Sequence, residues 1–510
     1  MTLINIRNLG ITLSSPLFSR LNLAVNAGDR IGLVAANGRG KSTLFRCMAD
    51  ALEATEGEIT RARGATVGYV EQNVPSPLLP LSFYEAVLDA LPPEQAESES
   101  WRVDIVLEGL EVPEEFRTRA LSALSGGWQR LAMLARVAVT EPDVLMLDEP
   151  TNHLDLGKIA MLETWLNALP RDTAVVIASH DRAFLDAVSN RTLFLRPENS
   201  QLFALPYSQA RTALDETDAA DAKRYERDMK AADQLRRQAA KLHNIGVNSG
   251  SDLLVVKTKQ LKQRADKLED AAKPAHLERS AGAIKLGNRG THAKVLVTLD
   301  DAEVRTPDGA VLFKTGKQFV CQGDRIVLLG ENGAGKSRFI AMLRKAIGNP
   351  EAAQDGIKAT PSLALGYADQ ALADLRDADT PMETIIRRFH VGDQRARSLL
   401  AGAGMNIDMQ SKPVARLSGG QKARLGMLVL RLTEPNFYLL DEPTNHLDID
   451  GQEALEGELM AHQASCLLVS HDRSFVRATG NRFWQIERKR LVEVESPEGF
   501  FAAAAASGAG

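Results

Sequence analysis

The chain contains two copies of one long motif, and this duplication limits its possible folds more than any other feature. LSALSGGWQRLAMLARVAVTEPDVLMLDEPTNHLD ends at Asp155, and its counterpart VARLSGGQKARLGMLVLRLTEPNFYLLDEPTNHLD ends at Asp448. Four landmarks, from an upstream Lys to a downstream His, recur in the same order at offsets of 291 to 295 residues. Such a repeat indicates the tandem duplication of a whole domain. The 510 residues are therefore expected to form two large domains and a joining segment.

Each copy has a glycine-rich turn between an apolar strand and a helix, ANGRGKST in the first copy and GENGAGKS in the second. Backbone N–H groups of such a turn converge on phosphate oxygens, while the Lys neutralises phosphate charge and the following Ser reaches Mg²⁺. The pattern predicts two P-loops. The predicted nucleotide contacts are Asn37, Gly38, Arg39, Gly40, Lys41, Ser42 and Thr43 in the first loop, and Gly330, Glu331, Asn332, Gly333, Ala334, Gly335, Lys336, Ser337 and Arg338 in the second.

The two loops are not identical. Ala35 stands where the G-x-x-x-x-G-K-[ST] spacing has its first glycine, whereas the second loop keeps Gly330 and places Arg338 after its Ser. The loss of one glycine can strain a tight turn by about 1 kcal/mol. The sequence therefore predicts that the two sites are unequal.

Each copy continues with a buried parallel strand that ends in two adjacent carboxylates. Successive side chains on a strand point in opposite directions, so the two acids are expected to have different roles. The first suits Mg²⁺ through water, and the second suits polarisation of the attacking water. The predicted magnesium ligands are Ser42, Asp148, Ser337 and Asp441, and the predicted catalytic carboxylates are Glu149 and Glu442.

Two further polar residues recur at strand ends. Gln72 and Gln370 each follow a VGYV- or LGYA-type strand, where the amide can lie near the γ-phosphate as a ligand of water and Mg²⁺. His180 and His471 each end an apolar strand, after Ser and before Asp-Arg. A lone His is usually structural, but its identical placement in both copies favours a sensor of the γ-phosphate.

The joining segment has a different pattern. Its apolar residues form two stripes at helical spacing, separated by NIGVNSGS at residues 244–251, which predicts an antiparallel helical hairpin. Residues 222–290 contain 16 Lys or Arg and 8 Asp or Glu, in a chain whose net charge is −5. A solvated hairpin would account for this charge as well as a binding surface would.

The order P-loop, Gln, LSGG, Asp-Glu, His is that of ATP-binding-cassette ATPases. Two cassettes on one chain, both followed by PTNHLD and without a membrane domain, resemble the ABC-F family over essentially the whole chain. The resemblance implies an α/β fold in which each cassette has a RecA-like core, an antiparallel β subdomain and a helical subdomain. The expected domains are 1–207 and 292–497 for the cassettes, 208–291 for the hairpin linker, and 498–510 for a low-complexity tail without order.

The resemblance implies an ATPase with ATP and Mg²⁺ as cofactors. Cassettes of this family meet head to tail, so a monomer with an intramolecular cassette pair is expected. A Ser hydroxyl and Gly amides at a helix start form a second anion site that can clamp ATP when the halves close. The implied residues are Ser418, Gly419, Gly420 and Gln421 for the Lys41 site, and Ser125, Gly126 and Gly127 for the Lys336 site.

The family usually has an aromatic residue upstream of each P-loop that stacks on adenine. Neither SSPLFSR nor RTPDGAVLF contains a Tyr, so Phe18 and Phe313 are the candidates for this role.

The linker resembles the family's tRNA-facing hairpin, which implies the ribosome as partner, through ribosomal RNA and tRNA. Such contacts would read phosphates and shape rather than sequence. The candidate contacts are Arg236, Arg237, Lys241, His243, Lys257 and Lys259. A translation factor and an antibiotic-resistance protein that protects the ribosome both fit this pattern.

Composition limits the alternatives. No run approaches the roughly 18 apolar residues of a membrane span and MTLINIRNLG lacks the features of a signal peptide, so a cytoplasmic protein is expected. The scattered Cys47, Cys321 and Cys466 are typical of buried thiols. A transporter ATPase with separate membrane subunits would not need the basic hairpin. A DNA-repair or chromosome protein would be expected to have zinc cysteines or much longer coiled-coil arms.

Overall fold

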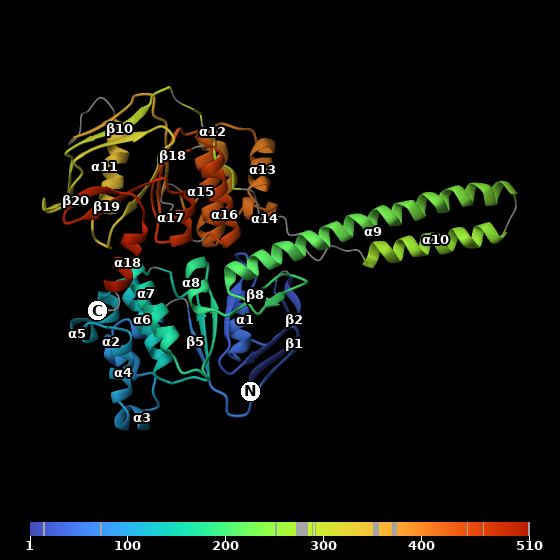
Figure 1. The fold of residues 1–510 in the computed structure, drawn as a ribbon, viewed down its shortest axis with the longest axis horizontal. Helices are drawn as coiled ribbons and strands as arrows, with labels where there is room; N and C mark the ends of the chain where they lie inside the picture. The colour runs from blue at the N-terminus through green and yellow to red at the C-terminus, as the bar shows by residue number, and fades with distance from the viewer. Residues whose placement is uncertain are drawn as a thin grey trace.

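The computed structural model describes residues 1–510 except 14–15, 72–73, 153, 250–251, 272–283, 288, 291, 350–355, 370–374, 446, 463 and 508–510. Two α/β lobes lie against one another and a long helical hairpin projects from their junction (Figure 1). We call the lobes cassette 1 and cassette 2, in chain order. The α/β class and the paired arrangement predicted from the duplication are confirmed.

Cassette 1 is built on a six-stranded sheet whose strands are parallel except at one edge. The P-loop strand β3 lies beside β7, and the strand that ends in the paired carboxylates, β6, is the next one out. The carboxyl ends of parallel strands share one sheet edge, so this order gathers the polar residues that follow each strand. In spatial order the strands are β5 (Val67–Val70), β6 (Val144–Asp148), β7 (Ala174–Ala178), β3 (Arg30–Val34), β8 (Arg191–Phe194) and β9 (Gln201–Phe203).

A second, antiparallel sheet covers the P-loop helix of cassette 1, as the resemblance to the ABC-F family implies. Its strands are β2 (Pro16–Asn26), β1 (Thr2–Thr12) and β4 (Glu56–Arg61). The helices of cassette 1 are α1 (Lys41–Met48), α2 (Phe83–Leu88), α3 (Pro93–Ser98), α4 (Trp101–Gly109), α5 (Glu114–Arg117), α6 (Gly126–Ala138), α7 (Leu156–Ala168) and α8 (Arg182–Val188).

Cassette 2 repeats this plan with an eight-stranded sheet and a three-stranded one. The large sheet runs β11 (Glu303–Arg305), β12 (Val311–Lys314), β20 (Arg490–Val494), β19 (Arg482–Glu487), β14 (Arg325–Leu329), β18 (Ser465–Val469), β17 (Phe437–Asp441) and β16 (Leu365–Ala368), and the small one β13 (Lys317–Cys321), β10 (Val295–Asp300) and β15 (Ile357–Ala359). The helices are α11 (Lys336–Gly348), α12 (Pro381–Phe389), α13 (Asp393–Gly402), α14 (Ile407–Gln410), α15 (Gly419–Leu432), α16 (Ile449–Ala461) and α17 (Arg473–Thr479).

The joining segment is the predicted antiparallel hairpin of α9 (Tyr207–Ser249) and α10 (Asp252–Ala271) (Figure 1). The break predicted at residues 244–251 is wrong in part, because α9 continues to Ser249 and a single 43-residue helix forms the first arm. The small side chains of Ala232, Ala239 and Ala265 are fully buried between the arms. They allow the two helices to approach closely.

The C-terminal segment differs from its predicted disorder. Glu498–Ser507 form helix α18, whose Phe501 is buried and whose Glu498 carboxylate accepts hydrogen bonds from Arg477 at 2.7 and 2.8 Å. The helix lies between the two lobes beside α7 (Figure 1). Alanine has the highest helix propensity, and the tertiary contact supplies the stability that a short isolated helix lacks. No helix in the described part of the chain is long and apolar enough to cross a bilayer.

Candidate functional site: two linked nucleotide sites

The two P-loops have the same backbone geometry. Gly40 and Gly335 precede helices α1 and α11 with φ of 91° and 102°, in the left-handed region that favours glycine. A Cβ atom at Gly335 would lie 2.9 Å from the Leu312 side chain. The loops therefore depend on these glycines to turn their N–H groups toward one point, as phosphate binding requires.

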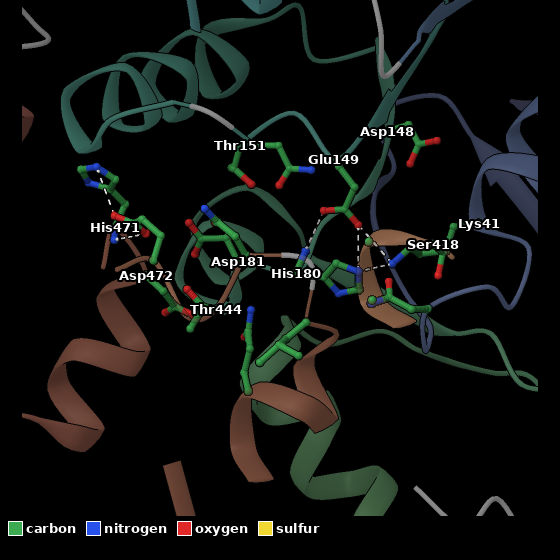
Figure 2. Close-up of a pocket in the computed structure, with 18 of the residues that line it drawn as sticks. Lys41, Asp148, Glu149, Thr151, His180, Asp181, Ser418, Thr444, His471 and Asp472 are labelled. Carbon is green, nitrogen blue, oxygen red and sulfur yellow. Dashed lines mark hydrogen bonds and ion pairs between the residues drawn. The ribbon is translucent and has the colours of Figure 1, made fainter. Parts of the chain in front are cut away.

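One cavity of about 620 Å³ contains both P-loop lysines and is lined by both cassettes. Lys41, Glu149 and His180 of cassette 1 share it with Ser418–Gly420 of cassette 2, and Figure 2 shows Ser418 beside Lys41. Helix α15 begins at this point, so its N-terminus faces the first P-loop. The structure thus brings the first P-loop and the signature of the opposite cassette together, as head-to-tail pairing implies.

The segments that follow the catalytic strands connect the cassettes across the cavity. The backbone N–H of Asn37 donates to Asp448 Oδ2 at 2.9 Å, and the side-chain amide of Asn332 donates to Asp155 Oδ2 at 3.2 Å. Each P-loop therefore contacts the final Asp of the other cassette's DEPTNHLD motif. Sequence reasoning did not assign a role to these two aspartates, although their position at the end of both repeated motifs could have indicated one.

The predicted magnesium ligands meet in pairs. Ser42 hydrogen-bonds the Asp148 carboxylate, and Ser337 hydrogen-bonds the Asp441 carboxylate. Burial raises the pKa of both aspartates, and the Ser hydroxyl partly opposes that increase. A partly desolvated carboxylate beside a hydroxyl suits a hard divalent cation, and Mg²⁺ usually takes only one or two protein oxygens with water and substrate phosphates. The residues present therefore fit the ion.

The two predicted catalytic glutamates adopt a strained conformation directly after strands β6 and β17. Glu149 and Glu442 have φ of 50° and 52°, a region that costs a non-glycine residue about 1–3 kcal/mol and is typical of functional sites. The backbone N–H groups of His180 and His471 each donate to the Oε2 atom of the respective Glu at 3.2 Å. Within the described residues, the buried Oε1 of Glu442 accepts no hydrogen bond.

Burial adjusts the protonation of these groups. It raises the pKa of Glu442 to about 8 and, with Lys336, lowers the pKa of His471 to about 4. Burial and then Lys41 lower the pKa of His180 well below its ordinary value. A carboxylate with a pKa near the working pH is an effective general base, and a neutral imidazole can donate one hydrogen bond while accepting another. The base and sensor roles of these residues stay predictions.

The two sites differ in the contacts of their P-loop lysines. Lys41 Nζ lies 3.1 Å from Glu149 Oε1 and 2.5 Å from His180 Nε2, whereas Lys336 Nζ donates to the carbonyls of Gly330 and Glu331 at 2.6 and 3.0 Å. Ser125–Gly127 of cassette 1 do not line the cavity. Ala35 has no left-handed φ, so the strain expected from its replacement of glycine is absent. The asymmetry comes from the side-chain contacts instead.

We therefore expect Lys41→Ala to reduce ATP turnover roughly tenfold more than Lys336→Ala, because a charge-assisted contact contributes about 1.5–3 kcal/mol. Single-turnover hydrolysis and nucleotide affinity of the two variants measure this difference. Lys345→Ala, an exposed lysine in the last turn of α11, is the matched control and should leave turnover unchanged. Equal losses in the two P-loop variants would contradict unequal sites.

The remaining predicted residues have mixed outcomes. Gln72 and Gln370 lie outside the described residues. Phe18 and Phe313 are 1% and 0% exposed beneath the P-loops, so the expectation that they stack on adenine is wrong. The exposed Leu13 and its neighbour Leu17 line the cavity at that position instead. Both rings pack against the P-loop glycines, because burying apolar surface in the core is more favourable than exposing it in the cavity.

Seven further predicted nucleotide contacts do not line the cavity: Gly330, Glu331, Gly333, Ala334, Gly335, Arg338 and Gln421. Gln421 and Ser418 form a reciprocal cap at the start of α15, with Gln421 Oε1 accepting from the Ser418 N–H at 2.9 Å. Arg338 is exposed and does not line the cavity. A capping role fixes the helix terminus that faces Lys41, and so supports the anion site indirectly.

Two P-loop cassettes that share one cavity, with the signature of one against the P-loop of the other, define the core of an ATP-binding-cassette ATPase. A family model described as ABC transporter matches residues 18–152 and 318–445, more than half of the chain. The chain belongs to this ATP-binding-cassette family, and its resemblance to the ABC-F branch is confirmed. Cassettes of this family bind ATP.

Relatives match over nearly the whole chain. The ATP-binding protein Uup of Buchnera aphidicola is 29% identical over 96% of this chain and 82% of its own length. The ABC transporter F family member 5 of Arabidopsis thaliana is 29% identical over 91% of this chain and 72% of its own length. Among solved structures, an archaeal ribosome recycling factor in complex with a ribosomal stalk protein has a TM-score of 0.64 at 20% identity, covering 98% of this chain and 92% of its own. This last similarity shows the tandem fold.

Proposed function

We propose that this protein hydrolyses ATP, binds the ribosome, and couples closure of its cassettes to the position of the basic hairpin near tRNA. Asp148 and Asp441 would hold Mg²⁺ with Ser42 and Ser337. Glu149 would take a proton from the attacking water and orient that water toward the γ-phosphate. Translation factors and proteins that protect the ribosome from antibiotics could both use this coupling.

The attachment of the hairpin to both cassettes is the observation that carries the proposal. Tyr207, the first residue of α9, is buried in the core of cassette 1. One turn later the Arg211 guanidinium lies 3.1 Å from both Asp450 and Glu453 of cassette 2. At the other end of the linker, Leu286 is buried in cassette 2. Any change in the angle between the cassettes must therefore move the hairpin.

The exposed charge of the hairpin supports RNA as its target. Lys241, His243, Lys257 and Lys259 are exposed near the turn, and Arg237 is exposed along the stem. Arg236 is different, because it bridges to Glu269 and Asp266 of the opposite arm. The guanidinium of Arg236 holds the two arms together, so the RNA contacts that we propose rest on the other five residues.

A solved structure of this fold, from a ribosome-bound complex of archaeal Pelota and ABCE1, has a TM-score of 0.60 at 20% identity to this chain. This similarity supports the proposal, and the test separates it from a transporter ATPase with separate membrane subunits, which would not bind ribosomes.

We expect Lys241→Ala/Lys257→Ala/Lys259→Ala to weaken binding to purified ribosomes and to lower the slope of log affinity against log salt by roughly two, since each lost phosphate contact on single strands contributes about 0.7. The change is made in a chain that carries Glu149→Gln and Glu442→Gln, so that hydrolysis does not interfere. Co-sedimentation over a salt series with ATP measures the affinity.

The matched control removes three exposed lysines from cassette 2, Lys317, Lys358 and Lys489, and should preserve the slope. An unchanged slope in the hairpin variant would show that the tip does not contact RNA. If the trapped protein shows no ATP-dependent sedimentation with ribosomes, the proposed function is wrong and the transporter alternative is favoured.

A further inference from the structure

The end of cassette 1 that is distant from cassette 2 exposes two large apolar side chains. Helices α3 and α4 lie at this end of the lobe (Figure 1). Trp101 and Ile105 of α4 are 55% and 58% exposed. They are four residues apart, so they lie on one face of the helix. Exposed Trp is rare on a surface without a partner and is enriched at interaction sites.

These apolar side chains are surrounded by negative charge. Residues 93–117, which we call the acidic face, contain eight Asp or Glu and two Lys or Arg. Both arginines are paired, Arg102 with Glu99 at 3.1 Å and Arg117 with Asp104 at 4.0 Å. Among the described residues, five exposed glutamates of this face form no ion pair: Glu94, Glu97, Glu108, Glu111 and Glu114.

Cassette 2 provides an internal comparison. Helices α4 and α5 correspond to α13 and α14, which lie at the 293-residue offset of the repeat, whereas α3 has no counterpart in cassette 2. Residues 101–117 contain five Asp or Glu and two Arg, but their counterpart, residues 394–410, contains one Asp and two Arg, and Arg395 and Arg397 are exposed. The two helical subdomains share one architecture and one catalytic function, so neither folding nor ATP binding requires their opposite charges. The difference indicates different partners.

We propose that the acidic face of cassette 1 binds a Lys/Arg-rich segment of another protein, which places an aliphatic or aromatic side chain against Trp101 and Ile105. Unpaired glutamates steer a cation toward the face and define a polar rim, and the apolar pair supplies the desolvated centre on which affinity depends. Nucleic acid is repelled by the same glutamates. This interaction is separate from the proposed contact of the hairpin with RNA, which lies at the opposite side of cassette 1.

The probe is a synthetic amphipathic peptide of Lys and Leu, titrated into the full-length protein without ribosomes while the tryptophan fluorescence is recorded, and the Trp101→Phe variant identifies the contribution of Trp101. We expect saturable binding with a blue shift of the emission, and no response to the matching Glu/Leu peptide. Trp101→Ala/Ile105→Ala should weaken peptide binding about tenfold or more, the usual loss at an interface centre. Glu108→Lys/Glu111→Lys should weaken it and reduce its salt dependence.

Two controls separate this site from a general effect of charge. Ile407→Ala removes an apolar residue that is 72% exposed on α14 of cassette 2, and should not change the affinity. Trp101→Phe should keep the affinity, measured with a labelled peptide, and lose the emission shift. Because these positions are remote from the nucleotide cavity, ATP turnover should be unchanged in all variants. Unchanged turnover also shows that the variants are folded.

Equal affinity of the peptide for the wild type and Trp101→Ala/Ile105→Ala would overturn the proposal. A shift of Trp101 emission by a single-stranded RNA oligonucleotide but not by the basic peptide would overturn it in favour of RNA. Neither result depends on whether the protein binds ribosomes.

Discussion

Replacing both Glu149 and Glu442 by glutamine should slow ATP hydrolysis by about 10²–10⁴-fold, the usual contribution of a general base, while ATP still binds. The amide fits the same space but cannot accept the proton of the attacking water. The His180 and His471 N–H groups can still donate to the amide oxygen, so the local structure should persist. With hydrolysis blocked, ATP should hold the cassettes closed.

Single-turnover hydrolysis and equilibrium binding of a fluorescent nucleotide test this expectation. The chain offers a matched control in Glu141 and Glu434, which occupy equivalent positions in the two cassettes and share a left-handed φ of 47°. Neither lines the nucleotide cavity, so Glu141→Gln/Glu434→Gln should retain normal turnover. Hydrolysis near the wild-type rate in the Glu149→Gln/Glu442→Gln protein would show that other groups are catalytic.

The second large effect is expected at two symmetric ion pairs between the cassettes. Arg182, at the start of α8, pairs with Glu456 of α16, and Arg473, at the start of α17, pairs with Glu163 of α7. All four side chains are 18% exposed or less. Each Arg directly follows the His-Asp pair after strand β7 or β18, so each ion pair connects the sensor segment of one cassette to a helix of the other.

Removing one partner should leave the other charge buried and unpaired, which costs about 2–5 kcal/mol. A difference of about 1.4 kcal/mol changes an equilibrium constant tenfold. Arg182→Ala should therefore shift the equilibrium toward separated cassettes by roughly 30-fold or more. The same change removes a cation near Asp472, whose pKa is already raised by burial and by Asp181 (Figure 2). We expect weaker ATP binding at both sites as a result.

A double-mutant cycle of Arg182→Ala and Glu456→Ala, read by interdomain fluorescence energy transfer at increasing ATP, measures the coupling. Arg477→Ala is the matched control, since its partner Glu498 is more exposed and belongs to the tail helix. Additive effects in the cycle would show that the pair does not stabilise the closed arrangement.

Local motifs were sufficient to predict the family of this protein and the positions of its two ATP-binding cassettes. The P-loops, the paired carboxylates and the sensor histidines each depend on a few consecutive residues after a strand, and their duplication made each assignment support the other. Helical spacing and a turn sequence predicted the hairpin in the same way. The chain's charge separation, with the excess of positive charge confined to the linker, also required only the sequence.

Only the tertiary structure decided which residues meet across the cassettes. Arg182 and Glu456 are 274 residues apart, and no local pattern relates them. Phe18 and Phe313 became core residues because packing against the P-loop glycines outweighs exposure, and Arg236 became a link between helices because two carboxylates face it. The tail is ordered because α7 offers it a surface. Periodicity specifies which side of an element is apolar, whereas the partner of that side depends on how distant segments pack.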